Sequence, residues 1–165
     1  MNLGLAMKLL HVLASFWFVS GVVARDFTFW RAARVSTIEG VHTLLQVSDF
    51  FEQWAVIRGG FLVLFFGLLT VWLQKWPIFG FLQGAQTNWL LVSLMLFVGG
   101  QVAIVPLRLI PRRHRRAQAL EGALARGAIT PELTAALNDQ VVNTFRKVEM
   151  AILVVIVILM VAKPF

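Results

Sequence analysis

Four long apolar segments alternate with charged segments along the chain, at residues 3–24, 54–76, 88–110 and 145–165. An α-helix rises about 1.5 Å per residue, so about 20 residues cross a hydrocarbon core about 30 Å thick. Each segment reaches that length when its polar ends are included. None shows the sustained alternation of apolar and polar residues that is typical of a membrane-spanning strand. The pattern predicts an all-α, polytopic membrane protein, with one integral membrane domain formed by a bundle of four transmembrane helices.

The first apolar segment has a second interpretation, a cleaved signal peptide. It lacks a basic region before its apolar run, and Val22-Val23-Ala24 matches a cleavage site only loosely. We therefore expect residues 3–24 to be retained as a helix.

The loop at residues 25–53 is predicted to be helical in its second half. Ser36-Thr37-Ile38-Glu39 matches the capping box, in which a serine and a glutamate satisfy each other's backbone donors at the start of a helix. Apolar residues then recur at helical spacing up to Trp54. This indicates an amphipathic helix that leads into the second apolar segment.

The loop at residues 111–144 is predicted to form a helical hairpin. Pro111 predicts a break, and Gly127 predicts the end of a helix over residues 112–126. Thr130 followed by Pro131 is typical of an N-cap and the first helical position. We expect the helix that starts there to continue into the last apolar segment.

Composition supports the membrane assignment. Hydrophobic residues make up 59% of the chain and charged residues 14%, against about 45–50% and about 25% in soluble domains. Such a chain cannot hide its apolar surface in a small soluble body, which excludes a disordered protein and a simple cytosolic enzyme. The absence of cysteine excludes disulfides and thiolate metal sites.

Charge predicts the orientation. The chain has 15 Lys and Arg against 8 Asp and Glu, and all of these basic residues except Lys8, Lys75 and Lys163 lie in or beside the two long loops. The positive-inside rule then places both loops in the cytoplasm and both termini outside a bacterial cytoplasmic (inner) membrane. At this location the basic excess does not indicate nucleic acid.

A run of arginines marks the second loop. Arg112, Arg113, Arg115 and Arg116 would suit anionic lipid head groups at the cytoplasmic face. Glu149 stands near the start of the fourth apolar segment, where an acidic residue is expected to pair with an arginine rather than to carry protons.

His11 is the main candidate for chemistry, because ionisable residues within membrane spans are costly and usually face the interior of the bundle. One interpretation is an axial ligand of haem b or a proton relay, since imidazole supplies nitrogen ligation and titrates near neutrality. The other is an interfacial histidine bonded to a neighbouring helix. No other histidine lies in an apolar segment, so a bis-histidine haem is not indicated.

The predicted topology brings Lys8, His11 and Lys163 to the outer face. Two cations near an imidazole disfavour its protonation, so we expect neutral His11 at pH 7. The cations would also attract porphyrin propionates or lipid phosphates. The alternative is that both lysines only extend to lipid phosphates and act as anchors.

Several motifs resemble a known family. Lys8-Leu9-Leu10-His11-Val12-Leu13, the proline and arginines from Pro106 to Arg116, and Leu159-Met160-Val161-Ala162-Lys163-Pro164 resemble a bacterial predicted integral membrane protein family of unknown function. Its layout is similar to that of four-helix, membrane-bound protoporphyrinogen oxidases, which share the Lys-Pro-Phe ending, and more distantly to that of copper-resistance membrane proteins. This resemblance implies a haem or porphyrin site centred on His11.

Two function classes follow. The chain has no phosphate-binding loop, no paired intramembrane carboxylates and no pair of nucleophile and base. The residues therefore favour a non-catalytic accessory or scaffolding component that binds a larger membrane complex or forms a homo-oligomer. The resemblance favours a haem b or porphyrin-binding membrane protein that uses His11.

Overall fold

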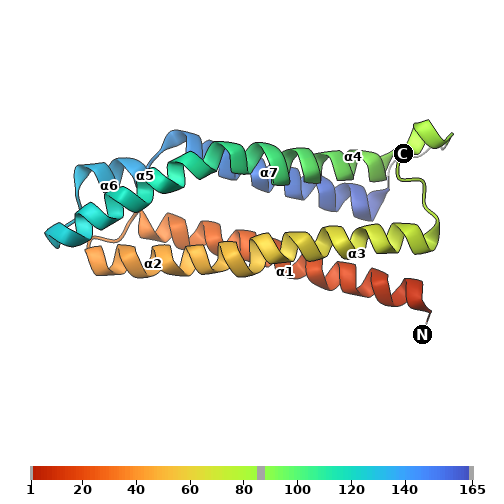
Figure 1. The fold of residues 1–165 in the computed structure, drawn as a ribbon, viewed down its shortest axis with the longest axis horizontal. Coiled ribbons are helices and arrows are strands. Elements are labelled where there is room, and N and C mark those ends of the chain that lie inside the picture. The colour runs from red at the N-terminus through yellow and green to blue at the C-terminus, as the bar shows by residue number, and fades with distance from the viewer. Residues whose placement is uncertain (1, 85–87, 164–165) are drawn as a thin grey trace.

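The computed structural model describes residues 2–84 and 88–163, except for the side chains of residues 101–106 and 108. Within these residues the chain contains helices and no strand, which confirms the all-α class. The helices form two antiparallel hairpins, one from α1, α2 and α3 and one from α4 to α7 (Figure 1). The marked N- and C-termini lie at the same end of the molecule.

Among the described residues, two helices are long and apolar enough to cross a membrane, and both belong to the first hairpin. Its first arm is α1 (Leu3–Ala32), which begins where the Asn2 side chain accepts a hydrogen bond from the amide of Gly4. Its second arm, residues Ile38–Gln74, is continuous and consists of α2 (Ile38–Phe51), the π-helical segment η1 (Glu52–Ile57) and α3 (Arg58–Gln74). The predicted continuity from the loop helix into the second apolar segment is confirmed.

The second hairpin begins after a 3₁₀ turn at Gly80–Gln83. Its first arm joins α4 (Trp89–Met95), the π-helical segment η3 (Leu96–Ile104) and α5 (Val105–Arg126). Its second arm consists of α6 (Pro131–Leu137) and α7 (Gln140–Ala162). Among the residues whose side chains the structure describes, the apolar stretch of the first arm is Trp89–Gly100. The predicted segment 145–165 ends on two residues, 164 and 165, that lie outside the described ones.

Two details of the predicted helix starts and breaks are wrong. The capping box is not formed, because α2 begins at Ile38 with Thr37 as its N-cap and without a side-chain cap hydrogen bond. The break expected at Pro111 is absent, because α5 continues through the proline. A proline removes only one backbone donor from a helix, and ion pairs made by Arg112 and Arg113 hold the chain just after it.

The helix predicted to start at Thr130 begins there but does not reach the last apolar segment. The Thr130 hydroxyl accepts a hydrogen bond from the Leu133 amide, and Gly127 has the expected positive φ of 65°. α6 then ends at Leu137, because Asp139 caps a new helix by accepting from the amides of Val141 and Val142. A short acidic side chain that bonds to the backbone ahead of it competes with helix continuation.

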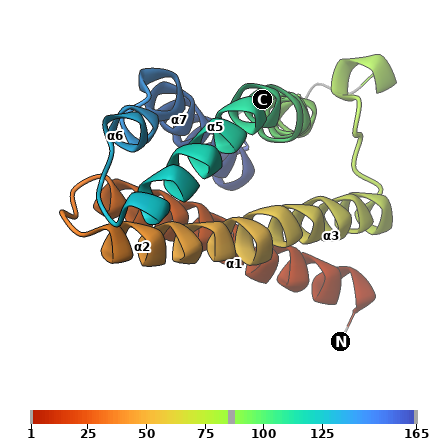
Figure 2. The same ribbon diagram turned by 60° about the vertical axis from the view of Figure 1, so that its left-hand side comes forward.

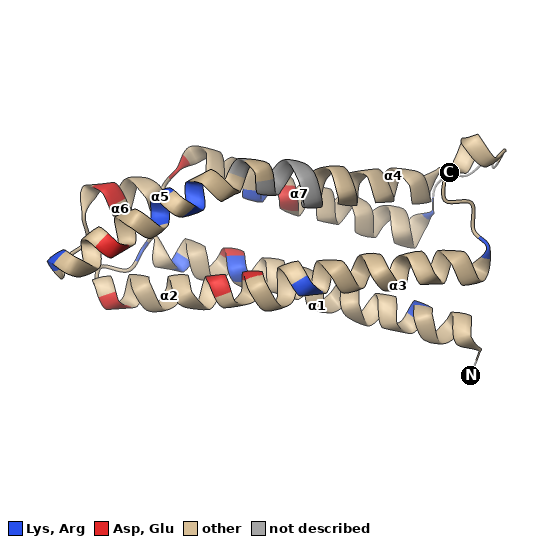
Figure 3. Cartoon of the chain, viewed as in Figure 1, with Lys and Arg blue, Asp and Glu red and all other residues tan. Residues whose placement is uncertain are grey.

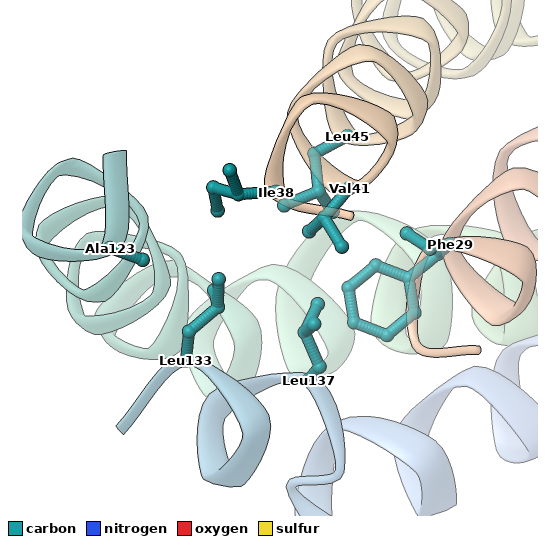
Figure 4. Packing of buried hydrophobic residues seen from close by; sticks show 8 residues of the cluster. Phe29, Ile38, Val41, Leu45, Ala123, Leu133 and Leu137 are labelled. Atoms are coloured by element: carbon teal, nitrogen blue, oxygen red, sulfur yellow. The ribbon is translucent and has the colours of Figure 1, made fainter. Parts of the chain in front are cut away.

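Two hydrophobic clusters join the hairpins. The larger one lies between α1, α2, α5 and α6 (Figure 4), where α5 contacts α2. Its buried residues are Phe29, Ala32, Ile38, Val41, Leu45, Ala123, Leu133 and Leu137. The smaller one, nearer the middle of the long axis, contains Phe18, Val22, Phe97 and Leu153.

Glycines allow helices to approach each other closely at several contacts. A side chain on Gly21 would collide with Ala55, and one on Gly59 would lie 3.2 Å from the backbone of Phe18. Gly67 lies in the same way against the ring of His11, so small residues bring α3 close to α1. In the second hairpin, Gly100 lies against Ile152 in the same way.

The molecule has a charged end and an apolar end (Figure 3). The charged end comprises α2, α6, the C-terminal parts of α1 and α5, and the start of α7. The apolar end comprises the start of α1, α3, α4 and the rest of α7. Turning the molecule by 60° keeps α1–α3 and α4–α7 as separate layers, with α5 leaning toward α2 (Figure 2). Many large apolar side chains are exposed around the apolar end, among them Phe61, Phe65 and Trp72.

Candidate functional site

His11 lies on the face of α1 that contacts α3. Its Nδ1 is 2.9 Å from the backbone carbonyl oxygen of Val63, and its ring lies against Gly67. A carbonyl oxygen can only accept a hydrogen bond, so Nδ1 carries the hydrogen. In the neutral imidazole the lone pair is therefore on Nε2, which is the ring atom that could ligate a metal.

The two lysines predicted to cluster with His11 occupy different surroundings. Lys8 is exposed on α1, one turn before His11. The Nζ of Lys163 lies 4.7 Å from the ring centroid of Trp76 and 5.4 Å from that of Trp89. Among the residues that the structure describes, no hydrogen bond, ion pair or ring contact joins either lysine to His11.

A buried arginine on α1 joins the two hairpins. Arg25 is 3% exposed and donates hydrogen bonds to Asp26, to Glu52 of η1 and to Glu149 of α7. The contact with Glu149 uses both carboxylate oxygens, at 2.6 Å from Nη2 and 3.3 Å from Nη1 of Arg25. The planar guanidinium is suited to such two-point contacts with carboxylates.

Further charged groups extend this cluster, which we call the Arg25 cluster (Arg25, Asp26, Glu52, Glu149, Arg113 and Arg146). Arg146 of α7 donates to Asp26 at 2.8 Å, and Arg113 of α5 pairs with Glu52. The hydroxyl of Ser48 donates to the Arg25 carbonyl oxygen at 3.2 Å, which fixes the backbone of α1 against α2. The cluster thus ties α1, η1, α5 and α7 together.

Glu52 is the first residue of the π-helical segment η1 and lies on the face of the second arm that contacts α1. Ser48, Glu52, Ala55 and Gly59 all contact α1, through Arg25, Gly21 or Phe18. This spacing of four, three and four residues keeps one face of the second arm on α1 as it passes from α2 through η1 into α3. π-Helical turns inside α-helices are often found at functional sites.

The arginines predicted to bind lipid head groups divide into two kinds. Arg112 pairs with Asp139 at 3.2 Å and Arg116 with Asp49 at 2.8 Å, and Arg113 belongs to the Arg25 cluster. Arg115 is exposed on α5. Three of the four thus contact carboxylates of this chain, and Arg115 faces outward.

The expected pairing of Glu149 with an arginine is confirmed, and that arginine is Arg25 of α1. Sequence reasoning missed Arg25, Asp26, Glu52 and Arg146 as members of a site. A signal was available, because Arg25, Asp26 and Glu52 flank the inner ends of the first two apolar segments and Glu149 lies near the same end of the fourth. Because neighbouring helices are antiparallel, those positions lie at the same level along the helix axes.

The arrangement is suited to holding helices together. Buried ion pairs must be complete to be tolerated, because removing one partner leaves an uncompensated charge at a cost of about 3–5 kcal/mol. Within residues 2–84 and 88–163 no group of three or more His, Cys, Asp or Glu side chains is placed to hold a metal ion.

Comparison with known proteins gives one match. The family described as "Predicted integral membrane protein (DUF2269)" matches residues 5–164. Comparisons with curated proteins and with solved structures gave no match. The family match covers nearly the whole chain and agrees with its two membrane-length apolar helices and exposed apolar surface. The chain therefore belongs to the DUF2269 family of predicted integral membrane proteins, whose function is unknown.

Proposed function

We propose that the protein crosses the bacterial cytoplasmic membrane four times, with both termini outside and the charged end in the cytoplasm. The position of both termini at one end supports an even number of crossings. Along α1, the distance from Lys8 to Arg25 is about 26 Å at 1.5 Å per residue, close to the thickness of a hydrocarbon core. The basic residues gathered at the charged end support the orientation.

Reporter fusions test this topology. Fusions after Arg34, Gly84, Gly127 and Phe165 should report inside, outside, inside and outside. A reporter placed after Gly127 that reads outside would contradict the proposed orientation.

Within that topology, the protein acts as a non-catalytic accessory or scaffolding component of the membrane. The observation that carries this proposal is an ion pair in the Arg25 cluster. The buried side chains of Arg25 and Glu149 pair with each other and join the two hairpins. These groups stabilise the fold and leave an outer surface rich in exposed aromatic and aliphatic side chains. Such a surface suits lipid, a second copy of the chain or a larger membrane complex.

Haem b or porphyrin binding at His11 is the second candidate. It is favoured by the hydrogen bond from Nδ1 to the Val63 carbonyl, because metal-ligating histidines usually donate their other ring N–H to a carbonyl or carboxylate. His11 thus fits one axial ligand through Nε2. A bound haem b would supply one-electron redox chemistry. Lys8 and Lys163 would attract its propionates, as cations do at a low-dielectric boundary.

The visible spectrum and mass of the protein purified in mild detergent separate the two candidates. The accessory role predicts a colourless protein whose mass includes a stoichiometric membrane partner or a second copy of the chain. A Soret band that is lost in His11→Ala and kept in His42→Ala would instead establish haem binding. A colourless protein with the mass of a single chain would contradict both.

The two lysines allow a finer test of the haem candidate. If they attract propionates, replacing both Lys8 and Lys163 by glutamine should reduce the bound pigment. Unchanged pigment in that double variant would show that the lysines are only anchors.

A further inference from the structure

Arginines make up half of the residues that line a small cavity at the charged end. Its volume is about 30 Å³, room for roughly two water-sized groups. Five guanidinium groups, from Arg25, Arg112, Arg113, Arg116 and Arg146, line it together with the Glu52 carboxylate. These arginines also pair with four carboxylates that do not line the cavity, from Asp26, Asp49, Asp139 and Glu149. The lining comes from both hairpins, so the cavity forms only when the hairpins are packed.

The cavity has a buried floor and an accessible rim. The side chain of Arg25 is 4% exposed, whereas those of Arg113 and Arg112 are 37% and 29% exposed. A ligand could therefore enter beside α5 and reach toward Arg25 without separating the helices.

The cavity lining offers more hydrogen-bond donors than acceptors, which favours a ligand that accepts hydrogen bonds. Each guanidinium carries five N–H donors and no acceptor, whereas a carboxylate only accepts. The Nε of Arg146 is buried and has no hydrogen-bond partner among the residues that the structure describes. A buried donor without a partner raises the free energy of the folded protein, and an acceptor bound in the cavity would remove this cost.

We propose that this cavity binds a phosphate group, with two of its oxygens inside and the remaining atoms at the rim near Arg112 and Arg113. Phosphate matches the forked donors of arginine, and its several oxygens can be shared by more than one guanidinium. The site also lies where α1 leaves its apolar stretch, the depth at which lipid phosphates occur at a membrane surface. The occupant is either a phospholipid head group or a free phosphate.

Thermal unfolding of the delipidated full-length protein in dodecyl maltoside tests this proposal. The two probes are inorganic phosphate and phosphatidylglycerol added to the micelles, each compared with sodium chloride at equal ionic strength. A ligand that binds only the folded protein raises the unfolding midpoint in a concentration-dependent way. We expect this shift with at least one probe, and its absence with both would overturn the proposal.

Variants show whether the effect arises in the cavity. Ala136→Leu fills the cavity without removing a charge, since Ala136 is a small lining residue on α6. Arg146→Lys keeps a positive charge beside Asp26 but removes the Nε donor. Loss of charge-assisted hydrogen bonds should weaken the apparent affinity about tenfold or more in either variant. If one variant does not fold, the other makes the same comparison.

Arg115→Gln is the matched control, because Arg115 is on the same helix but is exposed and does not line the cavity. It should keep the affinity within about twofold, since exposed charges contribute little to a defined site. Equal loss in Arg115→Gln and in the cavity variants, or full affinity in Ala136→Leu, would overturn the proposal.

The two probes distinguish the source of the phosphate. A shift with phosphatidylglycerol but not with inorganic phosphate identifies a lipid head group, and native mass spectrometry should then find lipid retained by the unmodified protein and lost in Ala136→Leu. A shift with inorganic phosphate alone identifies a free phosphate.

Discussion

At the charged end the larger hydrophobic cluster is buried between the hairpins, although Phe27, Trp30 and Phe50 are exposed there, whereas at the apolar end many large apolar side chains are exposed. Leu45 and Leu133 are 2% and 0% exposed at the charged end, while Phe61 and Trp72 at the apolar end are 68% and 72% exposed. In water the hydrophobic effect favours the burial of apolar side chains in a core, whereas in lipid this driving force is absent and they can stay on the surface. This difference is what water at the charged end and lipid at the apolar end would produce, as the proposed topology requires.

The means of holding helices together differ in the same way. The charged end combines a hydrophobic cluster with ion pairs that cross between the hairpins. Toward the apolar end, α1 and the second arm approach each other closely at Gly59 and Gly67. Substitutions that remove one kind of contact at a time should reveal how much each end contributes to the free energy of unfolding.

Removing the buried arginine should have the largest effect. Arg25→Gln leaves Glu149 and Glu52 without their shared partner, and we expect the free energy of unfolding to fall by about 3–5 kcal/mol. Thermal unfolding in detergent measures this loss, and Arg115→Gln, which removes an exposed arginine, should change little. Replacing the pair together, as Arg25→Met with Glu149→Leu, should restore part of the stability, because no unpaired charge remains. A double variant less stable than Arg25→Gln would contradict this explanation.

Truncating an apolar side chain should matter at one end only. Leu45→Ala removes a buried side chain and should cost about 2–5 kcal/mol of unfolding free energy. Phe61→Ala removes a larger side chain that already contacts detergent or lipid, so the unfolding midpoint should scarcely move. A comparable loss in Phe61→Ala would mean that this surface packs against protein.

Two glycine substitutions should act with opposite sign. In Gly21→Ala the new methyl group meets Ala55, and pushing α1 away from η1 should cost roughly 1–3 kcal/mol. Gly122 on α5 has no heavy atom within 4 Å of its added methyl group. Gly122→Ala should therefore stabilise the helix by about 0.5–1 kcal/mol. Equal effects on the unfolding midpoint would show that close approach at Gly21 is unimportant.

The smallest effect is expected at a helix start. Thr130→Ala removes the cap of the Leu133 amide and should cost about 1 kcal/mol. Thr134→Ala on the same helix removes a hydroxyl that bonds only to the carbonyl oxygen of Thr130, so it serves as the control. The cap has no special role if the two variants unfold at the same temperature.

Local sequence signals predicted much of the fold because they act over a few residues. The Thr130 cap and the Gly127 stop followed from residue type alone. The capping box at Ser36 and the break at Pro111 did not form. Each prediction rested on the local preference of one or a few residues, and packing against parts of the chain that are distant in sequence outweighed that preference.

The charged site was harder to predict than the helices. Glu149 was expected to pair with an arginine, but its partner lies 124 residues away in sequence, so no periodic pattern links the two. The arginines of residues 112–116 looked like a solvated basic run, and only the packing of α5 against the other helices shows which of them meet carboxylates. Whether His11 binds a pigment stays a prediction, because its contacts fit ligation and helix packing equally.

Single-cysteine labelling tests most directly whether the two ends lie in different solvents on opposite sides of a membrane. The chain has no cysteine, so Gln83→Cys, Phe61→Cys and Arg115→Cys each carry one reactive thiol at an exposed position. With a membrane-impermeant maleimide, we expect Gln83→Cys to react in cells whose outer membrane alone is permeabilised. Arg115→Cys should react only after the inner membrane is opened, and Phe61→Cys in neither case. Reaction of Arg115→Cys with the inner membrane intact, or of Phe61→Cys in either case, would contradict this account.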